Sequence, residues 1–150
     1  MSDHLKIRVA KDAGFCFGVR DAIEKAREVA QEHGKVYMLG DIVHNERVVK
    51  DLAQENVKVV DSLAEVKNAP VLFRAHGTIP ELWVEAGRKD LTIVDATCPL
   101  VHEIHDEIKK LDVEGRKLII IGDHGHDEVV AIRAQVTEAI IIASIAEAEA

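Results

Sequence analysis

Two cysteines, Cys16 and Cys98, each stand immediately before a segment with a helical pattern. Cys16 lies in the stretch GFCFG, where the glycines would let the backbone approach a bulky group closely. Cys98 lies between Thr97 and Pro99, and a helix N-terminus favours the thiolate form of cysteine that binds metals. Soft thiolates bind iron–sulfur clusters, zinc or copper(I). A lone cysteine is as often an inert small hydrophobe, so the prediction of a metal site depends on what accompanies the thiols.

Three histidines and a glutamate follow other apolar runs. His44 lies in GDIVHN, His76 in RAHGT and His126 in GDHGHDE. Glycines and expected helix starts beside His76 and His126 would gather backbone N–H groups, and such groups together with imidazoles can bind phosphate. Glu128 follows His126 by two positions and could donate a proton beside such an anion. These residue types therefore predict an anion-binding site.

The elements that would position these residues alternate regularly along the chain. Val- and Ile-rich runs predict strands over residues 6–11, 36–39, 57–60, 71–74, 91–94, 117–121 and 139–143. Apolar spacing and capping residues predict helices over residues 19–33, 46–55, 80–87, 99–112 and 128–136. Continuous apolar runs suit strands that are buried on both faces. The sequence thus predicts an α/β fold, a parallel sheet with flanking helices.

Five of these seven expected strands are followed by a Cys, His or Glu from the set above. In open α/β sheets, ligands bind at the carboxyl ends of the strands. We therefore expect the cysteines, the histidines and Glu128 to share one edge of the sheet. The other histidines are assigned to the N-terminal tail or to solvated helix faces: His4, His33, His102 and His105.

The composition suits a globular protein with an aliphatic core, since hydrophobic residues make up 47% and aromatic residues only 3%. The net charge of −8 argues against a nucleic-acid partner. No apolar run approaches the ~20 residues that span a bilayer, so no membrane partner is expected. The N-terminus lacks the features of a signal peptide, which predicts a cytoplasmic protein with reduced thiols.

A boundary is expected near residues 96–99, giving a first domain over 1–97 and the start of a second over 98–150. The first would carry Cys16, His44 and His76. The second would carry Cys98, His126 and Glu128 and would be truncated, because a capping box at residues 144–147 opens a helix where the sequence stops.

Five stretches together carry a resemblance to a known family: AGFCFGVRDAI, GDIVHNERVV, FRAHGT, DATCPLV and GDHGHDEV. The chain resembles the N-terminal portion of the 4-hydroxy-3-methylbut-2-enyl diphosphate reductases. The resemblance implies three α/β domains around a 4Fe–4S cluster that three cysteines hold. It implies an oxidoreductase of isoprenoid biosynthesis, on the methylerythritol phosphate route. Two electrons and two protons would remove the substrate's hydroxyl as water, giving isopentenyl and dimethylallyl diphosphate.

The same resemblance implies a role for each residue singled out above. Cys16 and Cys98 would be two of the three cluster ligands, and Glu128 would relay protons to the substrate. The diphosphate-binding residues would be His44, His76 and His126. The implied partners are a small diphosphate substrate and an electron donor such as ferredoxin or flavodoxin.

Two departures from the family pattern bear on these expectations. The family chain is considerably longer, and its third cysteine lies in a C-terminal half that this sequence does not contain, so these 150 residues alone are expected to have little reductase activity. The family usually has proline between the His and Glu of the last motif, where this chain has Asp127. Two alternatives stay open: a non-catalytic α/β fragment, and a metal-dependent hydrolase built on the His-x-His of residues 124–126.

Overall fold

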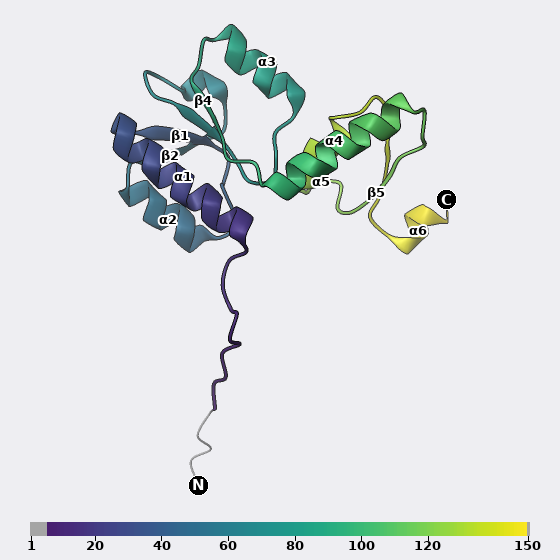
Figure 1. The fold of residues 1–150 in the computed structure, drawn as a ribbon, viewed down its shortest axis with the longest axis horizontal. Helices are drawn as coiled ribbons and strands as arrows, with labels where there is room; N and C mark the ends of the chain where they lie inside the picture. The colour runs from purple at the N-terminus through teal and green to yellow at the C-terminus, as the bar shows by residue number, and fades with distance from the viewer. Residues whose placement is uncertain (1–5, 150) are drawn as a thin grey trace.

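The computed structural model describes residues 6–149 and contains two parallel sheets (Figure 1). The first sheet has four strands in the order β2–β1–β3–β4, and the second pairs β5 with β6. The strands are β1 (Val36–Leu39), β2 (Val57–Val60), β3 (Val71–Phe73), β4 (Ile93–Asp95), β5 (Ile119–Ile121) and β6 (Ile140–Ile142). The helices are α1 (Phe17–His33), α2 (Glu46–Gln54), α3 (Pro80–Arg88), α4 (Pro99–Val113), α5 (Asp127–Arg133) and α6 (Ile145–Ala148), with a short 3₁₀ turn at Leu63–Glu65. The predicted α/β fold with a parallel sheet is confirmed.

Alternation along the strands divides the core of the first sheet into two layers. Val36 and Met38 of β1 pack with the apolar stripe of α1 and with Leu52 of α2. Tyr37 and Leu39 point to the opposite face, where Phe73 and the 3₁₀ turn join Ala86 of α3 in a second cluster. Figure 1 shows α1 and α2 on one side of this sheet and α3 on the other. The central strands β1 and β3 are buried on both faces, which explains why their sequences are unbroken apolar runs.

Local signals place the helix ends close to where the sequence predicts them. Gly34 ends α1 in the left-handed conformation, with φ of 73°. The Asn45 side chain accepts hydrogen bonds from the backbone N–H groups of Arg47 and Val48 and so caps α2. Pro80 and Pro99 occupy the first positions of α3 and α4, where a missing N–H costs nothing.

The second sheet is smaller and more exposed than the first. Helix α4 carries the chain from β4 to the second sheet (Figure 1). Ile121 of β5 is 86% exposed, and Ile119 and Ile140 also remain largely open to solvent. The two sheets lie on either side of the expected boundary near residues 96–99, and the division into domains 1–97 and 98–150 stays a prediction.

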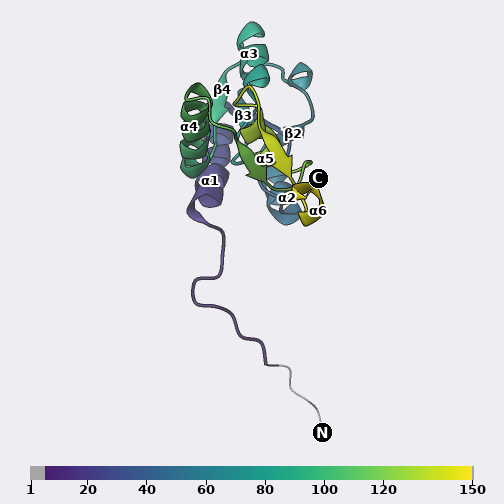
Figure 2. The same ribbon diagram turned by 90° about the vertical axis from the view of Figure 1, so that its right-hand side faces the viewer.

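One strand prediction is wrong. Residues 6–11 form no strand, and the segment extends away from the folded body (Figure 1, Figure 2). Ile7 and Val9 are 78% and 79% exposed. A strand needs a neighbour for its backbone N–H and C=O groups, and this segment pairs with none of the described strands. Cys16 is therefore positioned by the N-terminus of α1 and not by a preceding strand.

The assignment of His105 to a solvated helix face is also wrong. His105 is only 5% exposed, and its Nε2 is buried without a hydrogen-bond partner among the described residues. Its ring packs against Gly77, where a built Cβ would lie 2.7 Å from the His105 Cε1. His102 lies on the exposed side of α4 and hydrogen-bonds Asp95 at 2.9 Å, His33 is also exposed, and His4 lies outside the described residues. Within residues 6–149 no helix is long and apolar enough to cross a bilayer.

Replacing His105 by leucine should flatten the pH dependence of stability. Burial, followed by the charges of Lys109 and His102, lowers the pKa of His105 from its ordinary 6.5. As the pH falls, His105 is therefore protonated in the unfolded chain before it is protonated in the folded one. The contribution of the neutral, buried His105 to the free energy of unfolding is complete above pH 6.5 and is lost as the pH falls through the folded-state pKa. Urea unfolding at pH 7.5 and pH 5 measures the effect. An equal loss of stability on acidification in His105→Leu and the parent would contradict it.

Candidate functional site

The imidazole rings of His44, His76 and His126 form one cluster. The ring centroids of His44 and His76 lie 4.5 Å apart with the rings stacked, and His126 meets these two rings edge-on at 5.4 and 6.0 Å. The three residues come from the segments that follow β1, β3 and β5, so the cluster joins the two sheets. The structure thus brings together the histidines that the sequence singled out, while their role as anion ligands stays a prediction.

The four-stranded sheet with α1–α3 is called the first unit below, and the two-stranded sheet with α4–α6 the second unit. His44 and His76, the histidines of the first unit, are held by turns at the edge of its sheet. Gly40 follows β1 with φ of 70°, and its N–H donates to the carbonyl of Val60 on β2 at 2.9 Å. His44 then stands just before Asn45, the cap of α2. After β3, the Gly77 N–H donates to the Arg74 carbonyl at 3.1 Å and closes the turn that presents His76. Both imidazoles therefore sit on short loops anchored to a rigid sheet.

His126 is the N-cap of α5. Its Nδ1 accepts the backbone N–H of Glu128 at 3.2 Å, which fixes the ring and leaves Nε2 for another partner. Asp127 is the first residue of the helix, which therefore begins one position before the expected range of 128–136. Glu128 lies in the first turn of α5, and its predicted role as proton donor is not tested by this geometry. His126 and Glu128 are nevertheless positioned as one unit by the start of a helix.

Electrostatics make the cluster responsive to an anion. Burial first, and then the neighbouring charges of His44 and Arg74, lower the pKa of His76, whereas Asp127 raises it. His76 Nδ1 is also buried without a hydrogen-bond partner among the described residues. An anion placed among the rings would favour the protonated imidazole and raise this pKa. The cluster therefore suits reversible binding of a negatively charged group.

The two cysteines lie at the same edge of the structure. Cys16 and Cys98 occupy the N-cap positions of α1 and α4. Both thiols are free, and neither side chain makes a capping hydrogen bond. The Cys98 Sγ packs against Gly18 in the first turn of α1: a Cβ added to Gly18 would lie only 2.5 Å from this sulfur. Cys98 therefore contacts the helical turn that follows Cys16. The Cys98 N–H donates to the Ala75 carbonyl at 3.0 Å, which ties this cysteine to the loop of His76.

The two thiols are of the residue type that binds iron–sulfur clusters. Both are free thiols at helix N-termini. The 150-residue sequence contains two cysteines, one fewer than the three ligands that the resemblance implies. Within residues 6–149, no three Cys, His, Asp or Glu side chains are arranged to hold a metal ion. The residues present are thus suitable as two ligands of a cluster and insufficient as a complete set.

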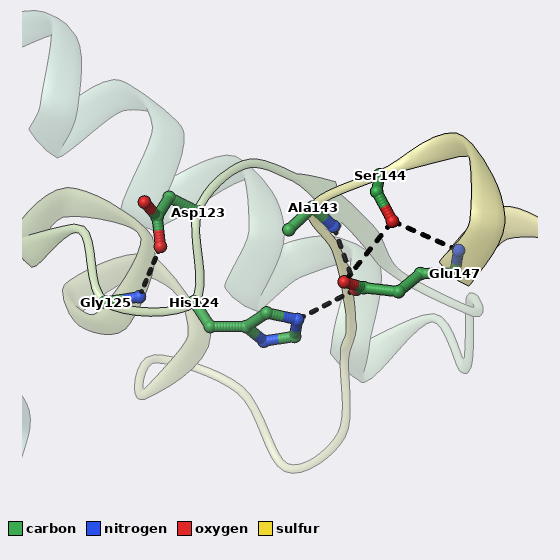
Figure 3. A network of polar contacts seen from close by, with 6 residues as sticks. All are labelled: Asp123, His124, Gly125, Ala143, Ser144 and Glu147. Carbon is green, nitrogen blue, oxygen red and sulfur yellow. Dashed lines mark hydrogen bonds and ion pairs between the residues drawn. The ribbon is translucent and has the colours of Figure 1, made fainter.

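His124 lies outside the histidine cluster. Its Nε2 pairs with Glu147 at 2.8 Å, and the same carboxylate accepts the Ala143 N–H at 3.0 Å (Figure 3). The Ser144 hydroxyl caps α6 by accepting the Glu147 N–H. The Ala143 N–H, followed by His124, lowers the pKa of Glu147. Because His124 and His126 have separate partners, the structure does not favour a His-x-His metal site.

Sequence reasoning missed one contact at the site. Arg74 follows β3, and its guanidinium makes two 2.8 Å hydrogen bonds to the carboxylate of Asp127. The sequence predicts no partner for Asp127 and no role for Arg74. An arginine two positions before His76 and an aspartate beside His126 were the available signal, but 53 residues separate them along the chain.

The parallel strands, with thiols and imidazoles in the segments that follow their carboxyl ends, place the chain among the α/β proteins. The model of one family, described as "LytB protein", matches residues 7–150. The chain belongs to this family, and the predicted resemblance is confirmed.

Named relatives agree with this membership. A 4-hydroxy-3-methylbut-2-enyl diphosphate reductase of Geobacter metallireducens is 41% identical over 128 residues, covering 85% of this chain and 45% of the relative. The reductase of the same name from Bacteroides thetaiotaomicron is 40% identical and covers 97% of this chain and 53% of its own. The chain therefore spans about half the length of the curated relatives it matches.

Two solved structures share the fold. The E-1-hydroxy-2-methyl-but-2-enyl-4-diphosphate reductase of Plasmodium falciparum superposes with a TM-score of 0.89 at 30% identity, over 93% of this chain and 45% of that one. A second, titled as (E)-4-hydroxy-3-methyl-but-2-enyl diphosphate reductase, the terminal enzyme of the non-mevalonate pathway, gives 0.80 at 34% identity over 94% of this chain and 52% of that one. The arrangement of strands and helices described above is therefore that of the family.

Gly18→Ala should destabilise the protein even though alanine favours helices. The added methyl would collide with the Cys98 Sγ, and such overpacking costs about 1–3 kcal/mol. Gly87→Ala in α3 is the matched control, because nothing lies within 4 Å of its built Cβ. There the substitution should stabilise by roughly 0.5–1 kcal/mol. Urea unfolding of both variants measures the difference, and equal stabilisation would show that Cys98 does not contact α1.

Proposed function

We propose that this chain forms the diphosphate-binding and cysteine-bearing part of a 4-hydroxy-3-methylbut-2-enyl diphosphate reductase. The reaction is the reductive removal of the substrate's hydroxyl as water, which yields isopentenyl and dimethylallyl diphosphate. The observation that carries the proposal is the convergence of His44, His76 and His126 from loops of two different sheets. A cytoplasmic location, expected from the sequence, belongs to the same proposal.

The histidines bind the diphosphate of the substrate. Protonated imidazoles supply charge-assisted hydrogen bonds to phosphate oxygens, and those bonds are about twice as strong as neutral ones. The depressed pKa of His76 means that this ring is uncharged at neutral pH until the anion arrives. Binding then takes up a proton, so affinity should increase as the pH falls.

Cys16 and Cys98 supply two of the three cysteine ligands of a 4Fe–4S cluster. The support is their chemistry and position, because both are free thiols at helix N-termini beside the histidine loops. When bound, the cluster supplies the two electrons of the reaction, which it receives from a donor such as ferredoxin or flavodoxin. The third cysteine would come from the half of the family's length that this sequence does not span.

Glu128 supplies protons to the departing hydroxyl. Its backbone N–H donates to the Nδ1 of His126, a proposed diphosphate ligand, which holds the Glu128 backbone beside the proposed anion site. A carboxylic acid beside an anion holds its proton more readily and can donate it in the transition state. The alternative, a non-catalytic α/β fragment, predicts neither anion nor iron binding and is separated by the experiments below.

Removing any one of the three histidines should weaken binding of inorganic diphosphate to the chain. A hydrogen bond to a charged group contributes about 1.5–3 kcal/mol, so each His→Ala change should cost roughly tenfold or more. Isothermal titration calorimetry measures the dissociation constants. His124→Ala is the control, since His124 pairs with Glu147 outside the cluster and should leave affinity unchanged. Equal affinity in His44→Ala, His76→Ala, His126→Ala and the parent would refute the assigned role.

Cys16→Ser and Cys98→Ser should each reduce the iron that the chain retains after anaerobic reconstitution with iron and sulfide. A hydroxyl is a far poorer ligand for iron than a thiolate. Iron content and visible absorbance after desalting measure retention. His33→Ala, at the opposite end of α1, is the control and should match the parent. Retention that is the same in all four proteins would mean that these thiols are not cluster ligands.

A further inference from the structure

The contact between Arg74 and Asp127 joins the two sheets beside the histidine cluster. Arg74 Nη1 and Nη2 donate to Asp127 Oδ2 and Oδ1, each at 2.8 Å. The two side chains are 26% and 33% exposed, which makes this the least exposed ion pair between described residues. Two parallel hydrogen bonds fix direction as well as distance, unlike a single-point contact.

Packing between the two units is incomplete beside the ion pair. A cavity of about 320 Å³ lies between them and is lined by Gly40, Arg74, Thr78, Asp127 and Ala131, among others. One other side-chain hydrogen bond links α5 and its following turn to the first unit within residues 6–149, from Gln135 to the Thr78 carbonyl at 3.4 Å. The ion pair is therefore the strongest directional contact across this gap.

The first unit provides space for the guanidinium. A Cβ built on Gly40 would lie 2.6 Å from Arg74 Nη1, and Gly40 has a φ of 70° that other residues rarely adopt. The end of β1, the end of β3 and the start of α5 therefore meet at this pair. Each partner also adjoins the site, since Arg74 precedes His76 by two residues and Asp127 lies between His126 and Glu128.

We propose that the Arg74–Asp127 ion pair is a positioning device that fixes His126 and Glu128 of the second unit against His76 of the first. Arg74 also compensates the charge of Asp127, so the carboxylate does not face the bound anion unopposed. The purpose assigned to the pair depends on the proposed function, while its geometry can be tested without any ligand.

The first measurement uses the free 150-residue chain. In Asp127→Asn and Arg74→Gln, nuclear Overhauser contacts between the His76 and His126 rings should weaken, and residual dipolar couplings should no longer fit one orientation of the two units. Arg27→Gln with Glu55→Gln is the control, because that exposed pair joins α1 to the end of α2 within the first unit. Unchanged ring contacts and couplings in both site variants would overturn the proposal. Should either single variant unfold, the double variant, which leaves no charge unpaired, provides the same measurement.

The pKa of His76 separates this role from simple loosening of the structure. Burial, His44, Arg74 and His126 lower that pKa, whereas Asp127 raises it. Asp127→Asn should therefore lower the pKa further, and Arg74→Gln should raise it. If the substitutions only loosened the structure, the His76 ring would become more exposed and its pKa would rise in both variants. That result would contradict the proposal that Arg74 and Asp127 lie directly beside His76.

Binding of inorganic diphosphate gives a third readout. Charge alone predicts tighter binding in Asp127→Asn, because a negative group is removed from beside an anion. If the ion pair positions His126, Asp127→Asn should instead bind diphosphate about tenfold more weakly. Because the two residues would act as one pair, the double variant should bind no more weakly than Arg74→Gln alone. Tighter binding in Asp127→Asn would overturn the proposal. If the parent itself binds no diphosphate, the proposed function fails, and the ring contacts and couplings of the free chain still decide whether the pair positions His126.

Discussion

The parallel direction of the strands is the constraint on which the site depends. Because β1, β3 and β4 run the same way in register, their carboxyl ends lie at one edge, and the loops that follow them carry His44, His76 and Cys98. The backbone hydrogen bond from Cys98 to Ala75 extends this register beyond the strands and links a thiol to a histidine loop. An antiparallel neighbour would send one of these loops to the opposite edge and separate the groups.

The second sheet contributes through the first residues of α5. His126 caps this helix, so its ring is fixed by a local bond to Glu128, and the helix in turn is fixed by Arg74. The three histidines that we propose as an anion site are thereby brought together from two units.

Much of this arrangement could be predicted from the sequence because its signals are local. Strand and helix positions follow from apolar runs and from caps such as Asn45, Gly34 and Pro99. The edge position of the histidines follows from the direction of parallel strands. Contacts between distant segments could not be predicted in this way. The burial of His105 depends on the loop at Gly77, and the partner of Asp127 lies 53 residues away. Residues 6–11 have a strand-like pattern, but pattern alone does not supply a neighbouring strand.

The central claim is that the three histidines of two units form one anion site. Its most direct test is a titration of the isotope-labelled chain with inorganic diphosphate, observed through the ring nitrogens of each histidine by NMR. We predict that the signals of His44, His76 and His126 shift together along one binding curve, while those of His33 and His124 follow none. Separate curves for the three rings, or a response confined to one of them, would contradict the account.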